Sequence, residues 1–258
     1  MRRLLVQPPR SRAADAALRV ALLGPAVAIV AAAASRLGRL APGPTLTVFA
    51  AGLGLAVLSL LFAVAAGAAI WRFGLRGAGS AAFAAAIAIA TLAWPARLAA
   101  YALTHPALRD VSTDMRSPPT FSPSASVAAA RGTPAPDKPD AASLAAEGAL
   151  ARPPEPLELD VTAEQAFRLA SASANRQGWA IVVDKPPGPR IGSGRIEAVA
   201  RTPALAFPLD VALRVTPAGG RSRIDMRVVA RAPLHDFGAT LSLLRSTMAD
   251  IDAAANGR

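Results

Sequence analysis

An uncharged apolar run over residues 45–71 limits most strongly what this chain can fold into. It is longer than the ~20 residues that an α-helix needs to cross the hydrocarbon core of a bilayer. A helix that is apolar on every side has to be buried, either in a large protein core or in a membrane. The run therefore predicts a transmembrane helix.

Two further apolar runs flank this helix. Residues 79–97 predict a span that ends in an interfacial region with Trp94 and Arg97. Residues 20–35 are short for a span and contain Pro25, but arginines at both ends can snorkel to the headgroups. The basic start of the chain and the small residues near Ser35 also fit a cleaved signal peptide. A first transmembrane helix and a signal peptide therefore both stay open for residues 20–35.

The distribution of charge predicts which side each loop occupies. Residues 1–103 hold ten of the 28 basic residues but one of the 17 acidic ones, Asp15. Seven of these arginines lie in the N-terminal tail and in the loop between the second and third runs, against two between the first and second. By the positive-inside rule the seven are cytoplasmic, which places the C-terminal domain outside, with or without cleavage of the first run.

The same distribution bears on the compartment and the partners. Arginine outnumbers lysine 26 to 2, which is typical of a GC-rich bacterial genome, so we expect the inner (plasma) membrane and a periplasmic or extracellular domain. The basic excess belongs to the membrane region and not to the soluble one. This favours the lipid bilayer as a partner and argues against a nucleic acid.

A polar motif follows the membrane region directly. It consists of Asp110, Val111, Ser112, Thr113, Asp114, Pro118, Pro119 and Phe121. The motif resembles the domain of unknown function 1499 family, whose members share D-[IV]-S-T-D-x-x-x-P-P-x-F and are often membrane-anchored. That family is uncharacterised, so the resemblance implies no particular reaction.

The chain after this motif predicts a linker and then an α+β domain. Residues 104–156 combine the motif junction with a Pro- and Ala-rich stretch, of which residues 128–151 are expected to be loosely ordered. In residues 157–258 a capping box at Thr162 and Gln165 begins a helix, and Asp236 is placed to cap a final helix. Between them we expect strands at residues 179–184, 194–201, 209–216 and 222–231, the first ended by the loop Pro186, Pro187, Gly188 and Pro189. The prediction is a two-layer domain with a four-stranded antiparallel sheet flanked by two helices.

The predicted strands divide into an apolar face and a charged face. Asp225, Arg227 and Arg231 share the charged face, as do Arg195, Glu197, Arg201, Asp210, Arg214 and Arg223. One interpretation is a solvated face with weak cross-strand ion pairs. The other is a site for an anionic ligand or another membrane protein, built on arginine guanidinium groups.

The family resemblance extends to this region. Relatives typically show D-x-R-S-x-S-R-x-G-x-S-D-x-G-x-N, and this chain keeps Asp225, Arg227, Arg231, Asp236 and Gly238. It departs from the pattern at Val228, Ala230, Pro233, His235 and Thr240. The resemblance therefore implies an altered version of any hydroxyl-lined site that relatives have.

Residues for catalysis are few. The chain has no cysteine and two histidines, His105 and His235, so no metal or cofactor site is expected. The side chains from Asp110 to Asp114 are expected to bond nearby backbone amides and to fix the turn that leaves the membrane. The sequence thus predicts a non-enzymatic binding or envelope-maintenance protein. The alternative is a membrane-anchored enzyme, such as a hydrolase, that uses residues 110–114 with Arg227 and Arg231.

Overall fold

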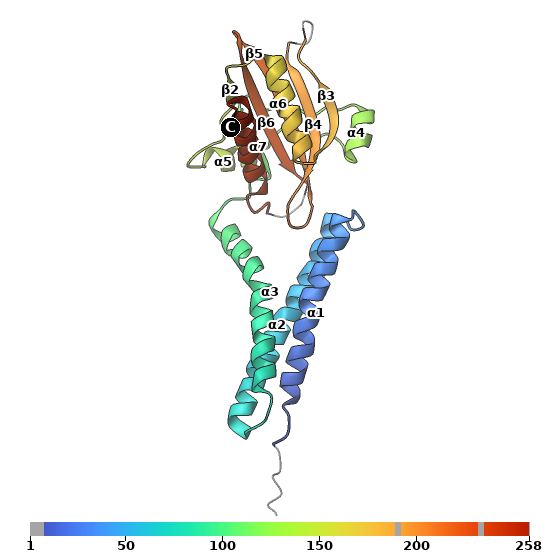
Figure 1. Cartoon of the computed structure of the whole chain (residues 1–258), viewed down its shortest axis with the longest axis vertical. Coiled ribbons are helices and arrows are strands. Elements are labelled where there is room, and N and C mark those ends of the chain that lie inside the picture. Colours follow the sequence, from blue (N-terminus) through green and yellow to red (C-terminus); the bar gives the residue numbers. More distant parts are fainter. Residues whose placement is uncertain (1–7, 189–191, 232–234, 258) are drawn as a thin grey trace, which may run out of the picture. The chain divides into compact units, whose positions relative to one another are not determined.

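The structure is a computed structural model that describes residues 8–188, 192–231 and 235–257 (Figure 1). The chain divides after Thr104 into two compact units. The first unit contains helices alone, and the second contains the sheet.

The first unit consists of α1 (Arg12–Arg36), α2 (Pro42–Phe73) and α3 (Ala78–Thr104). All three are long and apolar enough to cross a membrane, which supports a multi-pass membrane protein. The helix α1 begins eight residues before the apolar run predicted from the sequence, because the side chain of Ser11 accepts a hydrogen bond from the Ala14 amide and caps it. Residues 20–35 are therefore helical, while cleavage as a signal peptide stays a prediction.

Small residues let α1 and α2 approach closely. A Cβ atom added at Gly52 would lie 2.8 Å from the Gly24 carbonyl oxygen and 2.9 Å from the Ala28 amide nitrogen. The hydroxyl of Ser59 also donates to the Ala17 carbonyl at 2.9 Å. Gly54 has no such neighbour within 4 Å. Close packing thus depends on one glycine of α2, and not on its glycine content as a whole.

The second unit is built on a six-stranded antiparallel sheet, β1-β6-β5-β4-β3, in which β2 also pairs with β6. Its strands are β1 (Asp110–Ser112), β2 (Leu157–Leu159), β3 (Ala180–Lys185), β4 (Gly194–Arg201), β5 (Pro208–Ala218) and β6 (Arg221–Ala230). The prediction of four strands was wrong, because β1 and β2 have three residues each and are too short to show a period-2 pattern. Both lie along the same edge of β6. Of the loop predicted after β3, Pro189 lies outside the described residues.

Two helices, α6 (Ala163–Arg176) and α7 (Ala239–Ala255), pack against the apolar face of the sheet. Thr162 and Gln165 form the predicted capping box of α6. The N-cap position of α7 is Gly238, and the side chain of Asp236, two residues earlier, accepts from the Thr240 amide in the first turn, as a capping residue does. The core between the layers includes Ile196, Leu213, Ile224, Met226, Leu244 and Ile251, each at most 1% exposed.

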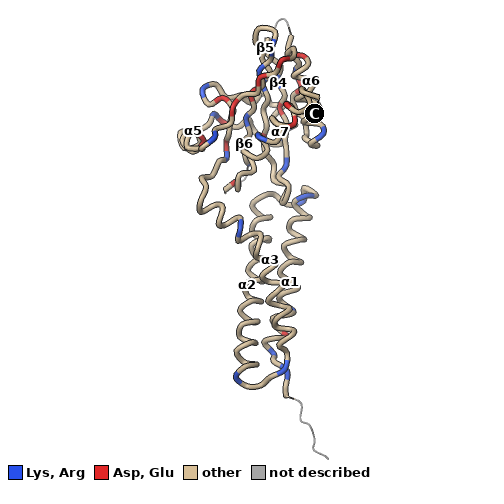
Figure 2. Tube along the Cα trace, turned by 60° about the vertical axis from the view of Figure 1, so that its left-hand side comes forward, with Lys and Arg blue, Asp and Glu red and all other residues tan. Residues whose placement is uncertain are grey.

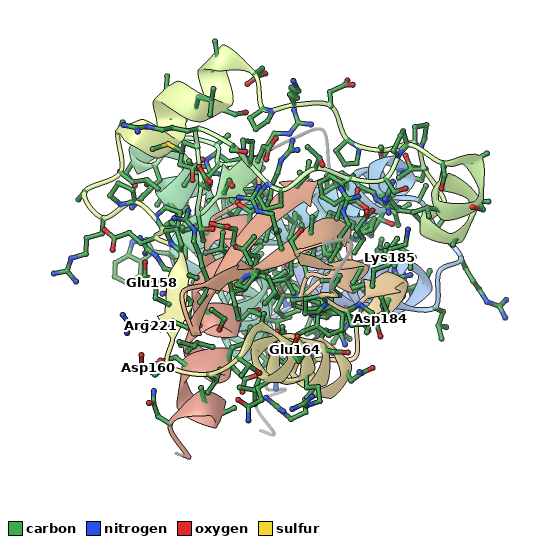
Figure 3. The ribbon with its side chains drawn as sticks, turned by 90° about the horizontal axis from the view of Figure 1, so that it is seen from above. Glu158, Asp160, Glu164, Asp184, Lys185 and Arg221 are labelled. Atoms are coloured by element: carbon green, nitrogen blue, oxygen red, sulfur yellow. The ribbon has the colours of Figure 1, made fainter. Side chains whose placement is uncertain are left out.

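The other face of the sheet is also covered. Residues 113–156, here called the covering segment, contain two short helices, α4 (Ala125–Arg131) and α5 (Ala141–Gly148). Figure 3 shows this segment on the side of the sheet opposite α6 and α7. Ser124 and Asp140 cap its helices, and Arg131 and Glu147 are buried beneath it. Residues 128–151, expected to be loosely ordered, thus include the end of α4 and all of α5.

Candidate functional site

The charged face of the sheet is a buried layer of ion pairs. Cross-strand register places Arg214 of β5 opposite Asp225 of β6, and Arg227 of β6 opposite Ser112 of β1. Asp225 and Arg227 are each 1% exposed, because the covering segment lies over them. The predicted cross-strand ion pairs are present, as between Arg214 and Asp225, but the expectation that this face is solvated was wrong for Asp225 and Arg227.

Asp110 and Arg227 form a bidentate pair at the centre of this layer. Arg227 donates from Nε to Asp110 Oδ1 at 2.8 Å and from Nη2 to Oδ2 at 2.6 Å. A second hydrogen bond from Nη2 goes to the backbone carbonyl of Asp137 in the covering segment. The prediction that the carboxylate of Asp110 bonds nearby backbone amides was wrong. Its role is to neutralise a buried guanidinium group.

A second group joins Asp114 to β5 and β6. Asp225 accepts from Arg214 and from Arg223, both at 2.9 Å, and Asp114 accepts from Arg214 at 3.1 Å. Burial raises the pKa of Asp114, but the Ser117 and Arg116 amides and the two arginine charges outweigh burial and hold this pKa below its ordinary value. The carboxylate of Asp114 is therefore stabilised in its charged form.

A third group ties the covering segment to β4 and β5. Arg131 contacts Glu197 and lies 3.7 Å from Asp210. Arg231 donates two hydrogen bonds to the Asp210 carboxylate, at 2.7 and 2.9 Å. Arg231 also donates to the Arg131 carbonyl oxygen at 3.0 Å. Within this layer, Nη1 of Arg131 is the one buried side-chain atom that lacks a hydrogen-bond partner among the described residues. Arg227 and Arg231, which the sequence placed in one candidate site, thus serve separate ion pairs.

Glu147 is the buried acid whose pKa departs most from its ordinary value. Its side chain accepts from the Ser112 amide at 3.0 Å, and the residue is 1% exposed. Burial raises the pKa of Glu147 to about 7, with the charge of Asp110 acting in the same direction. The Ser112 hydrogen bond and the Arg227 charge oppose this rise but do not cancel it.

An aromatic ring lies between two of these ion pairs. The guanidinium groups of Arg131 and Arg227 stand 5.3 and 5.4 Å from the centroid of the Phe121 ring. Phe121 is 6% exposed, so it is buried as predicted. It lies in the charged layer, however, and not in the apolar core between the sheet and the long helices.

The remaining motif residues have local or bridging roles. The Ser112 hydroxyl accepts from the Asp114 amide at 3.2 Å, as predicted, and Thr113 Oγ1 accepts from the Met226 amide at 2.9 Å.

Asp236 accepts from the Leu108 amide at 3.0 Å and from Thr240, and so fixes the start of α7 to the segment that leaves the membrane. His235 bonds the His105 carbonyl, and Pro233 lies outside the described residues.

Sequence reasoning missed Arg131 and Glu147 because both lie in Ala-rich stretches that have the composition of a linker. Capping residues at fixed spacing could have revealed them, since Ser124 and Asp140 each precede a short helix. No pattern in the sheet alone indicates that the charged face is covered.

The exposed charges of the domain lie elsewhere. Figure 3 labels Glu158, Asp160, Glu164, Asp184, Lys185 and Arg221, all of which are exposed. Arg221 and Asp160 form an ion pair whose side chains are 54 and 81% exposed. Within residues 8–188, 192–231 and 235–257, no group of three His, Cys, Asp or Glu side chains is arranged to hold a metal ion.

Comparison with known proteins identifies one family. The profile described as "Protein of unknown function (DUF1499)" matches residues 110–251, which is just over half of the chain. The match begins at the first residue of β1 and includes the covering segment, the whole sheet and most of α7. Neither the curated proteins nor the solved structures include a match to this chain.

Proposed function

The chain belongs to the DUF1499 family, and we propose that it is a multi-pass protein of the bacterial inner membrane whose periplasmic domain is a non-enzymatic binding module for envelope maintenance. The lipid bilayer is its first partner. A second partner is another membrane protein or an anionic ligand that meets the outer surface of the domain.

The pairing of Asp110 with Arg227 is the observation that carries this proposal. A catalytic acid, base or nucleophile has to come within hydrogen-bonding reach of a substrate. The side chain of Asp110 is 11% exposed and that of Arg227 1%, and the covering segment also binds Arg227 through a backbone carbonyl. The pairing supports a scaffold role for the motif residues.

The membrane part supports the proposed location. Three helices can cross a bilayer, and the charges at their ends are almost all arginines (Figure 2). By the positive-inside rule, this distribution favours a cytoplasmic N-terminus and an external domain. An external domain without cysteine has to be stabilised by its own packing and ion pairs, and the buried layer supplies those pairs.

A hydrolase would need the acidic side chains of residues 110–114 to be accessible to a substrate. It requires Asp110 to release Arg227, which would leave a buried guanidinium group unpaired at a cost of several kcal/mol, or Asp114 to release Arg214 and Arg223. The ion pairs favour the binding module over this alternative.

A complementation experiment separates the two functions. The variants are Asp110→Asn, which leaves Arg227 unpaired, and Asp160→Asn, a control with the same chemistry in an exposed pair. Each is produced in a bacterial strain that lacks the gene, and growth under envelope stress is compared with the amount of protease-resistant domain in the membrane.

We expect Asp110→Asn to lose function in proportion to its loss of folded domain, with Asp160→Asn like the wild type. If Asp110→Asn accumulates as folded protein at the wild-type level and still fails to support growth, the carboxylate acts in chemistry. That result would favour the hydrolase.

A further inference from the structure

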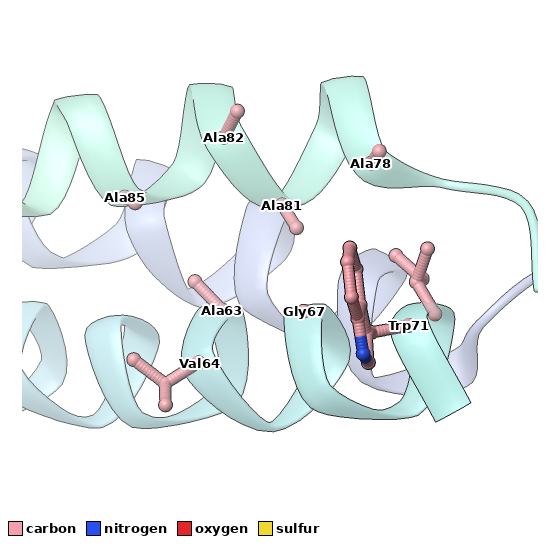
Figure 4. Close-up of a pocket in the computed structure, with 9 residues that line it drawn as sticks. Ala63, Val64, Gly67, Trp71, Ala78, Ala81, Ala82 and Ala85 are labelled. Atoms are coloured by element: carbon pink, nitrogen blue, oxygen red, sulfur yellow. The ribbon is translucent and has the colours of Figure 1, made fainter. Parts of the chain in front are cut away.

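An apolar groove runs between α2 and α3 in the helical unit. It has a volume of about 540 Å³ and is lined by small and branched side chains, among them Ala63, Gly67, Ala78 and Ala85 (Figure 4). This volume lies within the ~300–1,000 Å³ of ordinary small-molecule sites. Apart from the indole nitrogen of Trp71, the lining side chains carry no polar atom, so the groove suits an apolar ligand.

The groove has a closed back. On α1, Ala14 packs against Ala66 of α2 and Ala81 of α3, and all three residues are at most 6% exposed. No larger side chain of α1 fills the space in front of them, since the lining residues all come from α2 and α3. The groove therefore results from the packing of small residues.

The length of the groove fits part of a lipid chain. Its lining runs from Trp71 back to Ala63 on α2 and from Ala78 to Ala85 on α3. At 1.5 Å per helical residue this is about 12 Å. The hydrocarbon half of a bilayer is roughly 15 Å thick, so an acyl chain that enters at the interface would lie in the groove for most of one leaflet.

The entrance of the groove carries the polar features of an interface. Trp71 stands at this end with 93% of its surface exposed, and its indole N–H can donate to a lipid ester or phosphate oxygen. Arg72 and Arg76 follow it, and Arg10 and Arg12 lie at the same end because the backbone of residues 9–11 hydrogen-bonds to Arg76. One acid, Asp15, lies 3.8 Å from Arg10. This end of the helices is therefore strongly basic.

We propose that the groove binds one acyl chain of an anionic glycerophospholipid, whose phosphate lies against the arginines at its entrance. Basic pockets between transmembrane helices on the cytoplasmic side are the usual sites for such headgroups. The positive charge selects the headgroup, and the groove retains the chain. This site is distinct from the ion-pair layer of the soluble domain and goes beyond the proposed function.

The glycines of α2 allow a matched test of the groove. A Cβ atom added at Gly67 or at Gly54 meets no atom within 4 Å, so a side chain at either position begins in open space. Gly67 lines the groove and Gly54 does not. Full-length protein in detergent is mixed with equimolar dioleoyl phosphatidylglycerol and dioleoyl phosphatidylcholine, and bound lipid is counted by native mass spectrometry.

We expect the wild type and Gly54→Leu to retain phosphatidylglycerol at least about tenfold better than phosphatidylcholine. Gly67→Leu should lose bound lipid of both kinds, because its side chain occupies the groove. Arg72→Gln should lower the preference for phosphatidylglycerol while retention of phosphatidylcholine stays unchanged.

Three results would overturn the proposal. The wild type would retain both lipids equally if the arginines played no part. Gly67→Leu would bind lipid like Gly54→Leu if the groove were not the site. A change of oligomeric state in Gly67→Leu, with lipid binding intact, would assign the groove to a second copy of the chain.

Discussion

At the scale of single residues, the buried arginines of the domain hold two kinds of partner at once. Arg227 and Arg231 each pair with a carboxylate on the sheet and also donate to a backbone carbonyl of the covering segment. Lysine could not replace them, because a single ammonium group lacks the planar fork that meets both partners. The period-2 alternation predicted which residues share this face. It could not predict their burial, since that depends on residues 113–156, which are distant in sequence from β5 and β6.

Phe121 tests the packing of this layer. We expect Phe121→Ala to lower the free energy of unfolding by about 3–5 kcal/mol, because it removes a buried ring and leaves a cavity between two guanidinium groups. Thermal unfolding of the detergent-solubilised chain measures the loss. Phe237→Ala is the control, since Phe237 is 41% exposed and should change the melting temperature little. Equal melting temperatures for the Phe121 variant and the wild type would contradict the buried packing.

Glu147 predicts how stability depends on pH. Its pKa is about 7 in the folded domain and near 4.5 when unfolded, so the folded state favours the protonated form. The contribution of Glu147 to the free energy of unfolding is fully present below pH 4.5 and is lost as the pH rises through 7, a change of about 3 kcal/mol. Glu147→Gln stays neutral and keeps an oxygen for the Ser112 amide. We therefore expect this variant to be more stable than the wild type at pH 8 and similar to it near pH 4.5.

Hydrogen exchange of the amides in α5, followed from pH 5 to pH 8, measures this difference after correction for intrinsic exchange rates. The titration of Asp114 does not interfere with this measurement. The pKa of Asp114 is lowered, so its contribution to stability is lost only in acid, as the pH falls through that lowered pKa. A wild type and a Glu147→Gln variant with parallel pH profiles would show that Glu147 is ionised throughout.

At the scale of elements, long segments with one strong pattern were predictable and short ones were not. The three apolar helices, α6 with its capping box, and the strands β4, β5 and β6 follow from periodicity and turn residues. β1 and β2 form because β6 offers a free edge, and that edge is set by tertiary structure. Likewise α4 and α5 are short helices of 7 and 8 residues, which are unstable alone and depend on buried contacts, the Arg131–Glu197 ion pair for α4 and the hydrogen bond from the Ser112 amide to Glu147 for α5.

The contact between α1 and α2 gives a prediction for the helical unit. In Gly52→Val the new side chain would meet the backbone of Gly24 and Ala28, which cannot move aside without separating the helices. We expect a loss of about 1–3 kcal/mol, seen as a lower melting temperature of the solubilised protein. Gly54→Val adds the same atoms where no neighbour lies within 4 Å and should melt like the wild type. Equal melting of both variants would mean that this interface does not limit stability.

At the scale of the whole molecule, the distribution of arginines predicts the orientation of the chain. A reporter enzyme that is active only in the periplasm, fused after Arg258, should be active, because seven arginines mark the cytoplasmic side against two on the other. Replacing Arg72 and Arg76 by glutamine should weaken this preference. A reporter active only in the cytoplasm, fused at the same position, is the converse control, and its activity would rule out the proposed orientation.

The pairing of β1 with β6 also sets an order in time for assembly. Asp110 leaves the membrane first, but its partner Arg227 lies 117 residues later in the chain. Closing so long a loop is slow compared with forming local helices, and it cannot begin until the last strand has been synthesised. Until then the family motif has no strand to pair with. Until β6 is present, the nascent domain therefore stays incompletely folded, tethered to the bilayer and exposed to proteases.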